Sequence, residues 1–360
     1  MYSLYSWGSP FESEGLYSFD ASCVSAQAYL QLCKAEWQLC HVNSTGISQN
    51  GCLPALLYKD STIESGFWRT VQFLKTQGYN LDADLDEEQI SQSTAYISMI
   101  QDGLVDSLLF SWYLVSENFV EATRPRLAKL FGFPLSLAIP TQLQDYAVRR
   151  LKAVGVSSEV ENANTKDADD ETMPGSLRSK LPRIYLLAKE GFRRHADKST
   201  HPIYEQADQY LAALSKKLDK KQYFFGNKPT MLDTVAYGCL SLIVYVDLPQ
   251  NTLKTTIVEK YSNLVAFCDR IHAQLTPPTI VSEQSFLGGM GSIVKHAISR
   301  YTNISTVPPN NKRANPDLPV QVRSVAGALF VFFGYIIYNG ILSAPVSEQL
   351  PGVFTVIPDL

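Results

Sequence analysis

The sequence predicts three consecutive parts: a small α/β domain over residues 1–80, an all-helical domain over residues 87–275, and one transmembrane helix over residues 324–343. Three observations predict this order. Short alternating or apolar runs typical of strands are concentrated in the first part. After residue 87 the apolar residues recur at helical spacing. Near the C-terminus an uncharged apolar run is long enough to cross a bilayer.

Composition excludes several classes of protein. The chain has 360 residues, of which 45% are hydrophobic and 18% are charged, so it can bury a sizeable core and is not wholly disordered. It has 31 basic and 35 acidic residues and a net charge of −4. Because nucleic-acid binders carry a strong basic excess or stripe, no nucleic-acid partner is expected.

Most of the acidic excess lies in one segment, residues 157–175, which also contains almost no large apolar residue. We expect a mobile acidic insertion there, either a solvated loop or a site of phosphorylation or docking. The rest of the chain is close to neutral. The acidic residues of the segment are Glu159, Glu161, Asp167, Asp169, Asp170 and Glu171.

The cysteines and histidines lack metal-ligand spacing, so we expect neither a metal nor a cofactor. His195 and His201 are too far apart for one helix face. No secretory signal precedes the first strand, so the six cysteines are expected to remain thiols, mostly buried. They are Cys23, Cys33, Cys40, Cys52, Cys239 and Cys268.

The first domain is predicted to have a thioredoxin-like order of elements, β-α-β followed by β-β-α. Residues 1–6, 37–43 and 53–58 resemble strands, and a short fourth strand ends near Glu64. Asp20 is placed to cap the first helix. Pro54, at the start of the third strand, lies where this fold has a cis-proline, although the frequency of X-Pro isomers alone favours trans.

The second domain is predicted to be helical throughout, apart from the acidic insertion. Thr230 and Asp233 form a capping-box pattern at the start of a buried helix, which is a structural role. Residues 276–323 are expected to be a linker with a short helix near residues 290–301. The candidate helices are residues 88–103, 104–121, 140–154, 177–195, 201–219, 231–247 and 254–275.

The apolar run over residues 324–343 would span about 30 Å as a helix, which matches a bilayer core. A buried helix of a soluble domain is the alternative. Basic residues precede the run, and a short tail with two acidic residues, 344–360, follows it, so the body should face the cytosol. The side chains expected in the anchor include Val325, Leu329, Phe330, Phe332, Phe333, Ile336, Ile337 and Ile341.

The element order is that of glutathione transferases, so a catalytic site must be considered. Glu64 and Ser65 lie where transferases hold the carboxylate of glutathione, although Ser65 can equally cap the second helix. Cys23, in the first turn of the first helix, could be a reactive thiol or a packed one. We regard a glutathione-binding or catalytic role for Glu64, Ser65 and Cys23 as the weaker interpretation.

Several stretches resemble the metaxin family, which are transferase-like subunits of the sorting and assembly machinery of the mitochondrial outer membrane. They are LYSWG, DASCVSAQAYLQL, GCLPALLY, GYNLDADLDEEQ, FSWYLVSENFVEATRPRLAKLFGFPLSLAIP and the FFG-x-x-Pro-Thr-x-x-Asp box. The resemblance covers about residues 1–155 and 177–275. The acidic insertion and the C-terminal anchor look more like the anchored, fungal-type member.

The resemblance implies a non-enzymatic subunit of the complex that assembles β-barrels in the mitochondrial outer membrane, with its bulk facing the cytosol. The implied partners are the barrel-forming core subunit, a second transferase-like subunit, β-barrel precursors and outer-membrane lipid. The subunit would cover the core and aid insertion and release of precursors. The alternatives are a glutathione-binding enzyme and a generic tail-anchored adaptor.

Overall fold

The computed structural model describes residues 1–48, 50–58, 62–132, 135–156 and 201–282. The chain divides into two compact units, Met1–Ser299 and Arg300–Leu360, and every described residue belongs to the first. The acidic insertion, the predicted helices near residues 177–195 and 290–301, and the predicted anchor lie outside the described residues. Within the described ranges, no helix has the length and apolar character needed to cross a membrane.

The N-terminal domain contains a five-stranded sheet in the order β4-β3-β1-β2-β5. β1 is parallel to β2 and antiparallel to β3, and β3 is antiparallel to β4. β5 is parallel to β2 and lies within the segment assigned to the linker, where the sequence predicted no strand. The strands are Tyr2–Trp7, Trp37–Val42, Ala55–Tyr58, Thr62–Ser65 and Ile280–Ser282, from β1 to β5.

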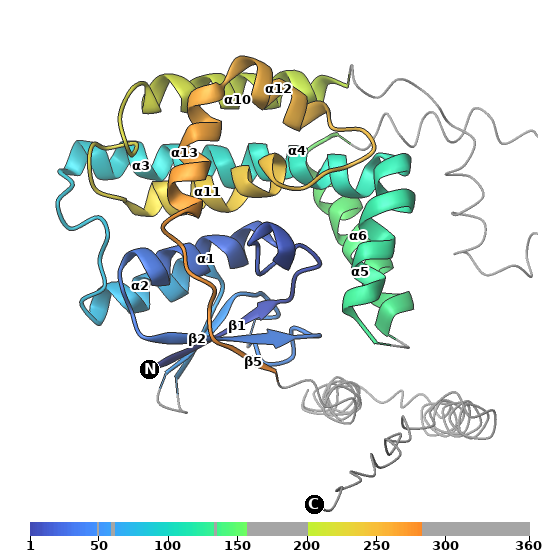
Figure 1. Ribbon diagram of the computed structural model, residues 1–360, viewed down its shortest axis with the longest axis horizontal. Helices are drawn as coiled ribbons and strands as arrows, with labels where there is room; N and C mark the ends of the chain where they lie inside the picture. The colour runs from blue at the N-terminus through green and yellow to red at the C-terminus, as the bar shows by residue number, and fades with distance from the viewer. Residues whose placement is uncertain (49, 59–61, 133–134, 157–200, 283–360) are drawn as a thin grey trace, which may run out of the picture. The chain divides into compact units, whose positions relative to one another are not determined.

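Two helices, α1 (Ala21–Leu32) and α2 (Phe67–Thr76), lie on the same face of this sheet, between it and the helical domain (Figure 1). The N-cap prediction at Asp20 is confirmed, because its Oδ1 accepts from the Cys23 N–H at 2.9 Å. α1 packs against α11 (Met231–Val244), all of whose residues are buried. The two helices approach so closely at Gly238 that a Cβ there would lie 2.1 Å from Ser25 Oγ.

The helical domain differs from prediction in where its helices break. The predicted helix over residues 104–121 is wrong, because the helical chain ends at Leu114 and Val115 is extended, with ψ of 109°. The prediction also missed α5 (Arg124–Leu130) and split α3 (Glu87–Met99) from α4 (Val105–Leu109), which are joined by a π-helical segment, Ile100–Leu104. Two further π-helical segments, Phe110–Leu114 and Asn118–Thr123, lie on either side of the break. The other α-helices of this domain among the described residues are α6 (Leu135–Ala153), α10 (Pro202–Leu218), α12 (Thr252–Lys260) and α13 (Ser262–His272).

Candidate functional site

The region where a transferase would bind glutathione lies at the corner between β3, β4 and α2. The Leu53–Pro54 peptide bond is cis, as the thioredoxin-like plan suggests. The Pro54 carbonyl accepts from the Gly66 N–H at 2.7 Å, which ties the start of β3 to the start of α2. The backbone of this corner is therefore built as the element order predicts.

Ser65 does not cap α2. It is the last residue of β4, pairs with Ala55 and is 4% exposed, whereas Gly66 takes the N-cap position. Gly66 has φ of 89°, which a glycine adopts without the steric cost that a side chain brings. The sequence prediction was off by one residue because serine is the commoner cap.

The loop before Pro54 directs its polar side chains toward itself and toward this corner. Asn50 Nδ2 donates to the Ser65 carbonyl at 3.2 Å. Asn50 Oδ1 accepts from Ser48 Oγ at 2.8 Å and from the Cys52 N–H at 3.0 Å. Asn50 thus joins the loop to the end of β4 through the Ser65 carbonyl.

Cys23 is poorly suited to nucleophilic chemistry. Its side chain is 0% exposed, and burial together with the charge of Asp20 raises the pKa of the thiol well above its ordinary value. Because the thiolate is the reactive form, a thiol that remains protonated is a weak nucleophile. The position at a helix N-terminus, which suggested a lowered pKa, is outweighed here by desolvation.

Aromatic side chains fill the contact between the loop after β1 and the helical domain. Phe11 of this loop meets Trp112 edge to face at 5.5 Å between ring centroids, and the Arg126 guanidinium lies 5.5 Å above the Phe11 ring. Trp7 contacts Phe131 in the same way at 6.1 Å. Such packing stabilises the junction of the two domains through burial of large apolar surface.

The capping box predicted at the start of α11 is present. Asp233 is fully buried and its Oδ2 accepts from the Thr230 N–H at 2.7 Å and from the Thr230 hydroxyl at 2.6 Å. Its Oδ1 accepts from the Phe224 N–H at 3.0 Å. Burial raises the pKa of Asp233 to about 6 despite these donors. The box holds the chain before α11 as well as the helix itself, so its role is structural.

Two buried polar clusters in the helical domain escaped prediction. Asn118 donates to the carbonyls of Ser111 and Gln250, both at 2.9 Å, and accepts from the Gln250 N–H at 2.7 Å. Arg150 forms an ion pair with the buried Asp106. Asn118 and Gln250, like Arg150 and Asp106, are far apart in the sequence, so no local sequence pattern predicts that they interact. Both clusters fix the helical break and the position of α6.

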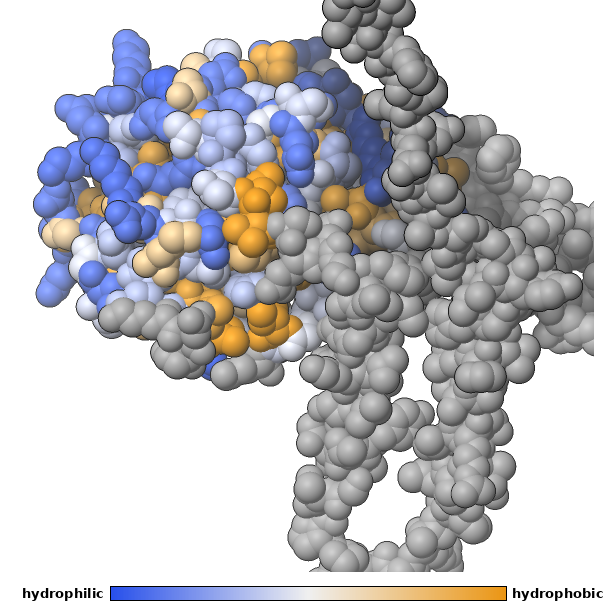
Figure 2. Space-filling view, turned by 60° about the horizontal axis from the view of Figure 1, so that its bottom comes forward, coloured by the Kyte–Doolittle hydropathy of each residue, from blue (hydrophilic) through white to orange (hydrophobic). Residues whose placement is uncertain are grey.

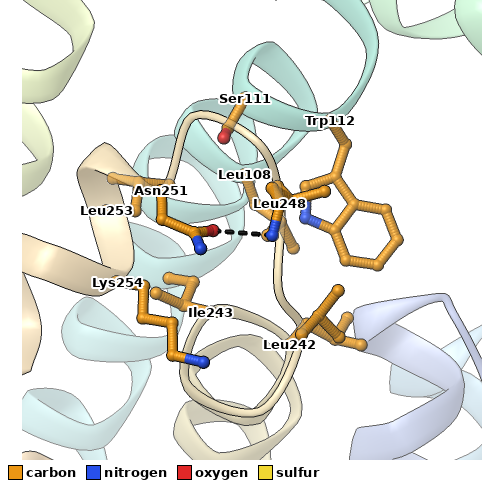
Figure 3. Close-up of a pocket in the computed structure, with 10 residues that line it drawn as sticks. Leu108, Ser111, Trp112, Leu242, Ile243, Leu248, Asn251, Leu253 and Lys254 are labelled. Carbon is orange, nitrogen blue, oxygen red and sulfur yellow. Dashed lines mark hydrogen bonds between the residues drawn. The ribbon is translucent and has the colours of Figure 1, made fainter. Parts of the chain in front are cut away.

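Two cavities lie away from the corner. The smaller, of about 10 Å³, has room for about one water molecule and is lined by Leu108, Trp112 and Leu248, whose N–H donates to Asn251 Oδ1 at 2.8 Å (Figure 3). The larger, of about 300 Å³, lies between α1 and the chain after α13. Tyr237 and His272 line it and bind each other at 2.8 Å. Neither cavity includes Ser65 or Cys23.

Comparison with known proteins gives two family matches. A family model described as "Outer mitochondrial membrane transport complex protein" matches residues 23–144, and one described as "Glutathione S-transferase, C-terminal domain" matches residues 207–271. Among solved structures, a glutathione S-transferase of Ceriporiopsis subvermispora in complex with glutathione has a TM-score of 0.46 and 10% identity. The match covers 77% of this chain and 98% of that one.

Curated relatives also match over most of the chain. Metaxin-1 of Bos taurus is 24% identical over 348 residues, which cover 94% of this chain and 92% of the relative. Metaxin-2 of Mus musculus is 27% identical and covers 71% of this chain and 82% of its own. Metaxin-3 of Xenopus laevis is 27% identical and covers 75% of each.

The strand order, the cis-proline and the all-helical second domain define a glutathione-transferase-like fold. Its corner is tied together by its own loop, and the helix-terminal cysteine is a buried thiol. Over most of its length the chain is similar to proteins of the metaxin family.

Proposed function

We propose that the protein is a non-enzymatic subunit of a sorting complex of the mitochondrial outer membrane and acts in β-barrel assembly. The observation that carries the proposal is the match of the outer-membrane transport complex family to residues 23–144, a range that runs from α1 into α6. The relatives named metaxin, matched over most of the chain, support the same complex. The body would face the cytosol and residues 324–343 would anchor it.

In this role the subunit would cover the barrel-forming core on its cytosolic side, beside a second transferase-like subunit. It would aid insertion and release of β-barrel precursors. The transferase-like fold would supply a rigid surface rather than a catalytic centre. An anchor in the outer membrane would hold that surface close to its partners, which raises the effective concentration of weak contacts.

One feature supports a non-enzymatic role: the Cys23 thiol is fully buried and its pKa is raised, so it is a weak nucleophile. The glutathione-binding enzyme remains the second candidate, because the cis-Pro54 corner is retained. Retention of the purified protein on a glutathione matrix, together with turnover that Ser65→Ala reduces, would favour the enzyme.

The decisive experiment is native purification of the tagged chain from detergent-solubilised mitochondria. We expect the barrel core to co-purify, and loss of the chain to reduce the assembled complex. A Cys23→Ala variant should behave as wild type, since that residue would have no chemical role. Absence of the barrel core from the purified material would overturn the proposal.

The anchor is tested separately. Carbonate extraction should leave the full-length chain in the membrane pellet, and a stop codon after Arg323 should release it to the supernatant. A full-length chain that washes off would show that residues 324–343 are peripheral or buried in protein. A chain that stays in the membrane without the barrel core would instead fit the generic tail-anchored adaptor.

A further inference from the structure

The larger cavity of the described structure is a candidate binding site that the proposed function does not use. It lies between α1, α11 and the chain that follows α13, which runs past α1 toward β5 (Figure 1). Its volume, about 300 Å³, is at the lower end of the range in which proteins bind small molecules. On the outer surface, in contrast, Figure 2 shows apolar side chains in several patches with hydrophilic side chains between them. The cavity therefore offers a more enclosed environment than the surface in that view.

The cavity has a buried floor and an exposed rim. Leu16, Val24 and Tyr237 form the floor and are 1%, 3% and 1% exposed. Ala273 and Thr276 lie at the rim and are exposed to solvent. A small molecule can therefore enter from solvent and bury most of its own surface. None of the described residues that line the cavity is Asp, Glu, Lys or Arg, which favours an uncharged ligand.

His272 supplies a hydrogen-bond donor to this cavity. Burial lowers the pKa of its imidazole, so the ring is neutral near pH 7. Tyr237 Oη lies 2.8 Å from Nδ1 and has no other acceptor among the described residues, so it donates to Nδ1. The proton of the neutral ring is then on Nε2. Glycine at position 15 leaves Nε2 unobstructed, because a Cβ there would lie 2.6 Å from it.

Gln27 of α1 supplies an acceptor to the same cavity. Its side chain lines the cavity and is 6% exposed. Its Nε2 donates to Ser6 Oγ at 3.3 Å and to the Tyr17 carbonyl at 3.4 Å. Because a carbonyl can only accept, the amide nitrogen must face Tyr17, and Oε1 has no partner in the described part of the chain. A buried oxygen without a partner is costly, so a ligand N–H would be favoured there.

The surrounding charge opposes an anionic ligand. The Asp269 carboxylate accepts from the Tyr245 hydroxyl at 2.8 Å, and the Tyr245 ring packs on the His272 ring at 4.7 Å between centroids. Since the charge of Asp269 acts on His272, it would also repel a negative group beside that ring. We propose that the cavity binds a small uncharged molecule that carries an amide, with Gln27 Oε1 accepting from its N–H and His272 Nε2 donating to its carbonyl.

A matched pair of photoreactive compounds tests the proposal. The compound para-benzoylbenzamide carries an uncharged amide and a ketone that inserts into nearby C–H bonds under ultraviolet light. The second compound, para-benzoylbenzoate, has almost the same shape but carries a carboxylate. The purified full-length chain in detergent is irradiated with increasing amounts of either compound, and labelled peptides are identified by mass spectrometry. The amide should saturably label peptides of α1 or of the chain after α13, and the carboxylate should label them less.

Variants of the rim and of the donor locate the site. Ala273→Trp fills the rim and should abolish labelling of these peptides. Ala266→Trp is the matched control, because Ala266 is also exposed but does not line the cavity, and it should be labelled as wild type. His272→Phe keeps a ring but removes the donor, so half-maximal labelling should need a roughly three- to tenfold higher concentration, the value of one hydrogen bond. His272→Gln retains an N–H and should restore part of the affinity.

Several results would overturn the proposal. Labelling that does not saturate, or that misses the cavity peptides, would do so. Equal labelling by the carboxylate and the amide would show that the cavity does not select an uncharged ligand. Labelling of Ala273→Trp that equals that of Ala266→Trp would place the compound elsewhere, and an unchanged half-saturation in His272→Phe would exclude the donor. None of these outcomes bears on the proposed assembly role, which does not depend on this cavity.

Discussion

Replacing Asp233 with alanine tests whether the buried capping box stabilises the whole helical domain. The substitution removes an acceptor from the Thr230 N–H, the Thr230 hydroxyl and the Phe224 N–H. Thr230 is 3% exposed and Phe224 is 0% exposed, so water cannot readily replace the carboxylate. The change therefore leaves buried donors without partners in addition to losing the helix cap.

Each buried donor left unsatisfied costs about 1–3 kcal/mol. The hydroxyl can rotate toward another acceptor, so the two backbone N–H groups dominate, and the free energy of unfolding should fall by about 3–5 kcal/mol. Equilibrium urea denaturation of the full-length chain, followed by tryptophan fluorescence, measures this loss as a shift of the midpoint.

Asp86 offers the matched control. Its carboxylate also caps a helix and accepts from the Gln89 N–H at 2.8 Å, but it is exposed to solvent. Asp86→Ala should cost only about 1 kcal/mol, since water can take over the hydrogen bonds. If Asp233→Ala costs no more than Asp86→Ala, the argument from burial is refuted.

Three further predictions follow from the buried polar groups. Iodoacetamide at neutral pH should label the exposed Cys52 and leave Cys23 unmodified; comparable rates would contradict the raised pKa of the Cys23 thiol. Arg150→Met should lower the free energy of unfolding by about 3 kcal/mol, because Asp106 stays buried without its partner, whereas adding Asp106→Leu should recover most of the loss in urea denaturation. The pKa of Asp233 is raised from 3.8 to about 6 in the folded chain, so the folded state binds the proton more tightly and loses stability as pH rises through about 6. Wild type should therefore gain about 1 kcal/mol over Asp233→Asn as pH falls from about 7 to about 5, and a difference that is flat with pH would exclude this titration.

Features set by neighbouring residues could be predicted from the sequence. Asp20 and the Thr230–Asp233 pair act within one turn of helix, so their spacing alone identifies them. The thioredoxin-like plan places a proline at position 54, but its cis isomer could not be predicted, because the frequency of X-Pro isomers alone favours trans. The helix α5 had a local signal that was overlooked, a proline, Pro125, within its first two residues.

Features set by distant residues could not be predicted. The break at Val115 is held by Asn118, which binds Gln250 on the far side of the acidic insertion. β5 has only three residues, so its β-branched Ile280 and Val281 are too short a run to identify a strand without the edge that β2 offers. At the candidate site, helix position suggested a lowered pKa for Cys23, but desolvation, a property of the folded core, decides its direction.

The pairing of β5 with β2 also sets the order in which the protein can mature during synthesis. Domains generally fold as they emerge from the ribosome, the N-terminal one first. Here Leu39 pairs with Ile280, so the sheet of the first domain stays incomplete until the whole second domain has been translated. Throughout that interval β2 is an open edge that can pair with another nascent strand. Translation of β5 therefore completes the sheet of the domain that is synthesised first.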